Sequence, residues 1–215
     1  MNEKETIMSL LKDIPNPVIF DIGACDGHET LWFKHIFPGA SIHTFEPDPR
    51  NIAKIKAQNI HTTPGINFNE FAIGETAGTF TLYQSDGRLD SQPASHTHTA
   101  SSSIKKPTED MYNLFPWIKF DKSTECAVMP LDTYVSTKGV QKIDLIWADV
   151  QGAERELILG GAEALKNTKY FYTEYCNTEI YENEANLEQI TKMLPDYWEV
   201  VKVFECDVLF KNNSI

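Results

Sequence analysis

Basic residues are scarce in this chain relative to acidic ones. Its 215 residues include 19 lysines and arginines against 31 aspartates and glutamates, which gives a formal net charge of −12. A charge of this sign repels phosphate backbones and anionic lipid surfaces at long range. We therefore expect neither nucleic acid nor a membrane surface as a partner.

Cysteines and long apolar runs are scarce as well. The four cysteines lie far apart without paired spacing, and the six histidines show no ligand spacing, so neither a disulfide framework nor a metal site is expected. No stretch approaches the roughly 20 apolar residues that span a bilayer, and residues 1–17 lack the apolar core of a signal peptide. A reducing, cytoplasmic setting fits this composition best.

The hydrophobic pattern alternates between short apolar runs and amphipathic stretches. We predict one domain over residues 1–215, in which residues 1–14 contain a lead-in helix that covers an edge of a sheet. The further predicted elements are strands over 17–23, 41–47, 68–73, 78–84, 142–150 and 169–175, helices over 29–37, 49–59, 153–166 and 184–194, a regular pattern over 126–134, and a terminal hairpin of 198–204 and 207–210. This order predicts an α/β fold with a single doubly wound, Rossmann-like and mostly parallel sheet that has an antiparallel edge strand.

Residues 85–108 form a long polar segment dominated by Ser, Thr, His, Asp and Pro. A connection of this length is uncommon inside a compact domain and is usually either functional or disordered. Two interpretations stay open, a mobile lid that closes over a bound ligand and a disordered surface insertion. In the first, the hydroxyl groups of Ser101–Ser103 supply hydrogen bonds to ligand or backbone.

Acidic residues recur at or just beyond the ends of four predicted strands. These are Asp21, Glu46, Asp149 and Glu174. Ligands of open parallel sheets bind beyond the carboxyl ends of the strands, so these carboxylates are the main candidates for a functional site. Glu46 follows Asp21 by 25 residues, close to the roughly 20-residue distance along the chain at which an acidic residue of this fold binds a ribose diol.

The loop after the first predicted strand reads DIGACDG. Gly23 and Gly27 allow a tight turn and a close approach of the backbone to a ligand. A dinucleotide fingerprint would read GxGxxG, and both this spacing and the added carboxylate of Asp26 disfavour pyrophosphate.

The motifs of the chain, taken in order, resemble those of the FkbM family of methyltransferases. They are FDIGACDGHET, FEPDP, NEFAIG with Gly78 after it, SSSI, PLDTY, KIDLIWADVQGAERELILGG and a later TEY, and they cover about residues 18–176. The resemblance implies a class I methyltransferase fold, S-adenosylmethionine as cofactor, and methylation of a hydroxyl on a small-molecule or glycan acceptor. The chain departs from the family at Cys25, usually Asn, and at Gln151, often Glu.

The resemblance also implies roles for single residues. Around the cofactor, Asp21 and Gly23 would shape the methionine end together with Ala24 and Gly27 of the same loop, Glu46 would bind the ribose, and Glu70, Phe71 and Ala72 would border the adenine. Asp149 and Gln151 would face the transferred methyl group, with Glu174 at the rim of the reaction centre and His28 as a proton acceptor. For the last two a plainer interpretation stays open, a surface glutamate and a solvent-exposed first residue of a helix.

Two other functions stay open at this point. A nucleotide-binding oxidoreductase would share the first strand, its loop and the ribose acid, although the missing GxGxxG and the DVQGAE segment disfavour it. A noncatalytic S-adenosylmethionine-binding module would keep the fold and lack the chemistry, and the unusual Cys25 raises this alternative.

Overall fold

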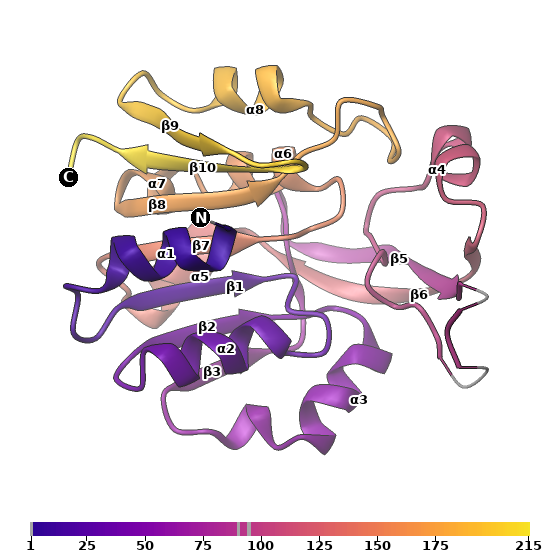
Figure 1. The fold of residues 1–215 in the computed structure, drawn as a ribbon, viewed down its shortest axis with the longest axis horizontal. Helices are drawn as coiled ribbons and strands as arrows, with labels where there is room; N and C mark the ends of the chain where they lie inside the picture. Colours follow the sequence, from indigo (N-terminus) through magenta and orange to yellow (C-terminus); the bar gives the residue numbers. More distant parts are fainter. Residues whose placement is uncertain (1, 90, 94–95) are drawn as a thin grey trace.

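The structure of the chain is a computed structural model, and it describes residues 2–89, 91–93 and 96–215. Its larger sheet has seven strands in the order β3-β2-β1-β7-β8-β10-β9 (Figure 1). The bounds of these strands are β1 Val18–Ile22, β2 Ser41–Phe45, β3 Ile66–Asn69, β7 Ile143–Ala148, β8 Thr168–Glu174, β9 Trp198–Val203 and β10 Asp207–Asn212.

Strand pairing confirms the predicted fold class. Strands β3, β2, β1, β7 and β8 pair in parallel, and β10 runs antiparallel to both β8 and β9. Because β1 lies between β2 and β7, the winding of the sheet reverses at β1, which is where ligands bind in doubly wound folds. The antiparallel strand is β10, which is the second strand from the edge of the sheet. The edge strand is β9, the other strand of the terminal hairpin.

Helices cover both faces of this sheet, and each face has its own apolar core (Figure 1). One core contains residues of α1, α2, α3 and η1, and the other contains residues of α5, α6, α7 and α8. The bounds are α1 Glu3–Leu11, α2 His28–Ile36, α3 Pro49–Ala57, η1 Ile60–Thr62, α5 Leu131–Lys138, α6 Glu154–Gly160, α7 Ala162–Lys166 and α8 Leu187–Met193. Neighbouring strand residues alternate between the cores, as with Ile19 and Phe20, because side chains of a strand point to opposite faces in turn.

The lead-in helix α1 covers a face of the sheet and not its edge. Ile7 and Leu11 are buried in the same core as Leu145 and Tyr170 of the central strands β7 and β8. Its apolar spacing correctly predicted a packed helix, but that spacing carries no information on which surface the helix covers.

A second, smaller sheet joins β4 (Ala72–Ile73), β6 (Ile118–Met129) and β5 (Gly78–Gly87) in the order β4-β6-β5. The predicted strand over 68–73 is therefore divided between two sheets. The first eight residues of β6 were missed because they lie on a largely exposed ribbon, where no buried face imposes an apolar alternation. The short helix α4 (Glu109–Leu114) was missed too, and the helix predicted over 153–166 is interrupted at Gly161 between α6 and α7.

Candidate active site

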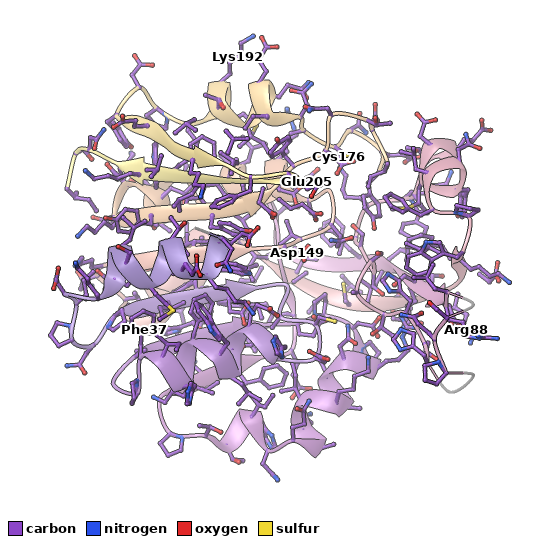
Figure 2. All side chains as sticks on the ribbon, viewed as in Figure 1. Phe37, Arg88, Asp149, Cys176, Lys192 and Glu205 are labelled. Carbon is purple, nitrogen blue, oxygen red and sulfur yellow. The ribbon has the colours of Figure 1, made fainter. Side chains whose placement is uncertain are left out.

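A pocket of about 510 Å³ lies beyond the carboxyl ends of β1, β2 and β7. Gly23, Glu46 and Asp149 line it from the larger sheet, and Ala72 and Leu82 line it from the smaller one. Residues 99, 100 and 102–104 of the long polar segment complete the lining. Figure 2 labels Asp149 in the centre of the molecule, where the two sheets meet.

Close backbone packing around Gly23 shapes the floor of this pocket. Gly23 has φ +90°, and a Cβ atom there would lie 1.8 Å from the carbonyl oxygen of Asp149. The N–H groups of Gly23 and Ala24 both donate to the Phe45 carbonyl at 3.0 Å, and the Asp149 N–H donates to the Ile22 carbonyl at 2.9 Å. Only glycine permits this approach, which brings the ends of β1, β2 and β7 together.

The Glu46 carboxylate is held in place at the pocket wall. Its two oxygens accept hydrogen bonds from the Cys25 N–H and the Asp48 N–H, both at 2.7 Å. Burial raises the pKa of Glu46 to about 8, although these two hydrogen bonds act in the opposite direction. Because each carboxylate oxygen has a further lone pair, the group can still accept hydrogen bonds from a ligand.

Three predicted residues of the glycine loop do not line the pocket. Asp21 is buried behind the loop, where it accepts a hydrogen bond from the Thr30 hydroxyl, and burial raises the pKa of Asp21 to about 7. Ala24 packs in the core under α2, and a Cβ at Gly27 would lie 2.5 Å from Ile60 Cδ1. These residues shape the loop from behind, and their proposed contact with a cofactor stays a prediction.

Of the residues predicted to border the adenine and the residue predicted as proton acceptor, only one lines the pocket. Ala72 lines the pocket, whereas Glu70 forms an exposed ion pair with Lys56 at 2.6 Å, and Phe71 packs against the ring of Phe45 at a centroid distance of 5.7 Å. His28 is the exposed first residue of α2 and does not line the pocket, as its plainer interpretation has it.

Gln151 joins Asp149 and Glu174 into one group. Its Nε2 donates to Asp149 Oδ1 at 2.5 Å and to Glu174 Oε2 at 2.9 Å. Burial raises the pKa of Asp149, opposed by the bond from Gln151, while burial and then the charge of Asp149 raise the pKa of Glu174 to about 10. The two carboxyl groups therefore retain at least one proton at neutral pH, which also lowers the cost of burying them.

A polar network that sequence reasoning missed holds the long segment against α3. Ser102 Oγ donates to Asp48 Oδ2 at 2.9 Å, and Arg50 donates to the same oxygen at 2.6 Å. Burial raises the pKa of Asp48, but the hydrogen bonds from Arg50 outweigh it and hold that pKa below its usual value. Thr99 and Asn51 form a second link, with Thr99 Oγ1 donating to Asn51 Oδ1 at 2.6 Å. The SSSI motif was the available signal for Ser102, and nothing in the sequence paired it with Asp48.

Segment 85–108 has a more regular beginning than the sequence indicated. Residues 85–87 belong to β5, and Ser103 pairs with Tyr83 through two backbone hydrogen bonds of 2.8 and 3.0 Å. Residues 90, 94 and 95 of the proposed lid lie outside the described residues. The lid itself stays a prediction.

Two further findings concern metals and membranes. Within the ranges 2–89, 91–93 and 96–215, no three His, Cys, Asp or Glu side chains come together as metal ligands. Over the same described part of the chain, no helix is long and apolar enough to cross a bilayer.

Known structures share the fold at low sequence identity. The chain aligns with the crystal structure of methyltransferase FkbM from Methylobacillus flagellatus KT at TM-score 0.56 and 13% identity, over 92% of this chain but only 44% of that one. An rRNA methylase from Streptococcus thermophilus aligns at TM-score 0.52 and 7% identity, over 99% and 97% of the two chains.

Curated sequences show a nearer relationship. The 2-O-methyltransferase NoeI of Sinorhizobium fredii (strain NBRC 101917 / NGR234) is 37% identical, over 97% of this chain and 84% of NoeI. The 31-O-demethyl-FK506 methyltransferase FkbM of Streptomyces tacrolimicus is 23% identical, over 94% and 79%. The family model of the methyltransferase FkbM domain matches residues 21–201, so the resemblance of the motifs is confirmed and the chain belongs to the FkbM methyltransferase family.

Proposed function

We propose that this methyltransferase uses S-adenosylmethionine to methylate a hydroxyl group of a sugar, a glycan unit or a natural product. Family membership and the O-methyltransferase relatives support this proposal and remove the oxidoreductase alternative. The observation that carries it is the fixed Glu46 carboxyl group, which lines the pocket at the point where the winding of the sheet reverses. A noncatalytic module would have no need of the buried group of Asp149, Gln151 and Glu174.

The pocket residues fit this cofactor. Glu46 offers lone pairs to two ribose hydroxyls, and Phe45, Ala72 and Ile73 supply apolar surface for a base. Gly23 and Asp149 both line the pocket and are in direct backbone contact, which only a residue without a side chain at position 23 permits. A methyl sulfonium supplies an electrophilic carbon with a good leaving group, so the protein has to align an acceptor oxygen with that carbon.

Alignment accounts for most of the rate enhancement that we propose. Holding nucleophile and electrophile in line contributes as much as about 7 to 11 kcal/mol, whereas a general base typically adds 10²- to 10⁴-fold, about 3 to 5 kcal/mol. The acceptor hydroxyl would lose its proton as its oxygen bonds to the methyl carbon and the bond from that carbon to sulfur breaks. In our proposal the unprotonated member of the Asp149 and Glu174 pair accepts it, while the other member keeps its proton.

The acceptor class is tested by measuring methyl incorporation from labelled S-adenosylmethionine into a panel of sugars, glycans, hydroxylated natural products, free nucleotides and capped RNA. We expect labelling of a hydroxyl compound without phosphate, since the acidic chain disfavours polyanions. Robust labelling of RNA alone would overturn the acceptor class. Binding of the cofactor with no turnover on any hydroxyl compound would favour the noncatalytic module.

The ribose role of Glu46 is tested by Glu46→Gln. We expect the affinity for S-adenosylhomocysteine, measured by calorimetry, to fall by about 1 to 3 kcal/mol, which is about 5- to 150-fold, because one of the two oxygens that can accept from ribose hydroxyls becomes an amide NH2 group, which only donates. Glu75→Gln makes the same change at an exposed position and serves as the matched control. Equal affinities of a folded Glu46→Gln protein and the control would remove Glu46 from the ribose site.

The role of Asp149 is tested by Asp149→Asn, which keeps the shape of the side chain and removes its basicity. We expect kcat to fall about 10²- to 10⁴-fold while the affinity for S-adenosylhomocysteine changes only a few-fold, as for a residue that acts in the transition state. Turnover and calorimetry on the same preparation give both quantities. Parallel losses of binding and rate would instead make Asp149 a binding residue.

The lid hypothesis concerns residues 85–108, and its test uses the described residues 96–104, several of which line the pocket. We expect their amide hydrogen exchange to slow when cofactor product and acceptor are both bound, because closing over the ligands excludes water and improves alignment. The control is the exchange of β7, which should not respond. Equal exchange of residues 96–104 in the free, binary and ternary states would contradict a lid.

A further inference from the structure

Tyr181 lies next to the reaction centre but comes from a different part of the chain, the loop between β8 and α8. Only 1% of its surface is exposed, and a Cβ at Gly152 would lie 2.7 to 2.9 Å from three carbon atoms of its side chain. The Glu184 carboxylate accepts hydrogen bonds from the N–H groups of Ile180 at 2.9 Å and Tyr181 at 3.1 Å. The ring and its backbone are thus fixed independently of the hydroxyl group.

The hydroxyl of Tyr181 has two acceptors. It donates to the Ser101 carbonyl at 2.7 Å and to Gln151 Oε1 at 3.1 Å, so the single phenolic proton is shared between them. Because Oε1 of Gln151 faces the phenol, Nε2 of the same amide faces Asp149 and Glu174. Without the hydroxyl, nothing else among the described contacts holds Gln151 Oε1.

Gln151 is also attached to the pocket through its backbone. It has φ +52°, in the left-handed region, and Ser103 Oγ donates to its carbonyl oxygen at 2.6 Å. Ser103 lines the pocket and Ser101 stands two residues before it, so the same segment contacts Gln151 directly and Tyr181 through its backbone. The position of this segment is therefore coupled to the orientation of the amide.

We propose that Tyr181 is a positioning residue of the methyl transfer, which holds the Gln151 amide against Asp149 and Glu174 and links both to the segment over the pocket. This inference rests on the function proposed above. No part of it requires Tyr181 to touch cofactor or acceptor.

The charges around the carboxyl pair decide the direction of the expected effect. Asp21 of β1, Glu29 of α2, Glu154 of α6 and Asp207 of β10 all act on the pair, and all are acidic. The hydrogen bond from Gln151 lowers the pKa of Asp149 against this background. If the amide turns away, the pair keeps its second proton up to a higher pH. Less of the singly protonated pair, which is the form that accepts a proton, is then present at neutral pH.

The test is Tyr181→Phe, which keeps the ring against Gly152 and removes only the hydroxyl. We expect kcat at neutral pH to fall roughly 10-fold, the acid limb of the kcat profile to move about 0.5 to 1 pH unit higher, and the KM for S-adenosylmethionine to stay within about two-fold. Tyr134→Phe is the matched control, since it removes a buried hydroxyl that bonds His43 and Asn69 in the core. We expect its pH profile to match that of the unmodified protein.

A double-mutant cycle with Gln151→Ala separates positioning from packing. If Tyr181 acts through Gln151, removing its hydroxyl in the Gln151→Ala protein has no further effect on kcat. Additive losses, or an unshifted profile in Tyr181→Phe, would overturn the inference.

A measurement without turnover keeps this inference distinct from the proposed function. In protein bound to S-adenosylhomocysteine, the carboxyl carbons of Asp149 and Glu174 are titrated by NMR with and without the Tyr181 hydroxyl. A raised titration midpoint in Tyr181→Phe supports the positioning role, even if no acceptor is methylated and the proposed function fails. Identical midpoints would contradict it, even if methyl transfer is found.

Discussion

The contact between Gly23 and the Asp149 carbonyl is the constraint on which the rest of the site depends. Because residue 23 is a glycine and has no side chain, the loop after β1 can lie directly on the end of β7. The same loop donates two hydrogen bonds to Phe45 at the end of β2, so one tight turn gathers three strand ends. Glu46 and Asp149 then face a common pocket from its two sides because the residues before them are packed in register.

Around this turn, Glu46, Glu154 and Glu174 are buried without an ion pair to any residue that the structure describes, whereas Asp48 is paired with Arg50. Burial raises the pKa values of Glu46 and Glu154 to about 8 and that of Glu174 to about 10. Each of these folded-state values exceeds the unfolded one, so the stability they contribute is present at low pH and is lost as pH rises through the folded values. Between Asp149 and Glu174 lies the neutral amide of Gln151, and not a cation that would hold both carboxyl groups in their charged form. In the proposed reaction one member of the pair keeps its proton, and the unprotonated member accepts the proton that leaves the acceptor hydroxyl.

Local sequence patterns predicted the parts of the site that depend on single strands and turns. Glu46, Gly23 and Asp149 were identified because each follows an apolar run, and the ends of parallel strands meet at one edge. Asp21 was grouped with them, yet it lies behind the loop, because strand side chains alternate and it is Ile22 that reaches the pocket. The part played by Tyr181 and the pairing of Ser102 with Asp48 could not be predicted, since the bonded partners stand 30 and 54 residues apart and no periodicity links them. The first residues of β6 were not predicted as a strand for another reason. They lie on an exposed ribbon, where no buried face imposes an alternation of apolar and polar residues.

The segment over the pocket is attached in a manner that differs from the rest of the fold. The two faces of the larger sheet pack through buried apolar cores, whereas residues 99–103 are held mainly by hydrogen bonds to Asp48, Asn51 and the Tyr181 hydroxyl. A hydrogen bond exchanged for one with water costs about 0.5 to 1.5 kcal/mol, while opening an apolar core exposes several side chains at about 1.5 to 3 kcal/mol each. If this segment acts as the proposed lid, opening it would break these hydrogen bonds and leave the apolar cores of the larger sheet intact. Because Ser103 donates to the Gln151 carbonyl and the Tyr181 hydroxyl joins Ser101 to Gln151 Oε1, a lid motion of this segment, as proposed above, would also disturb the amide that faces Asp149 and Glu174.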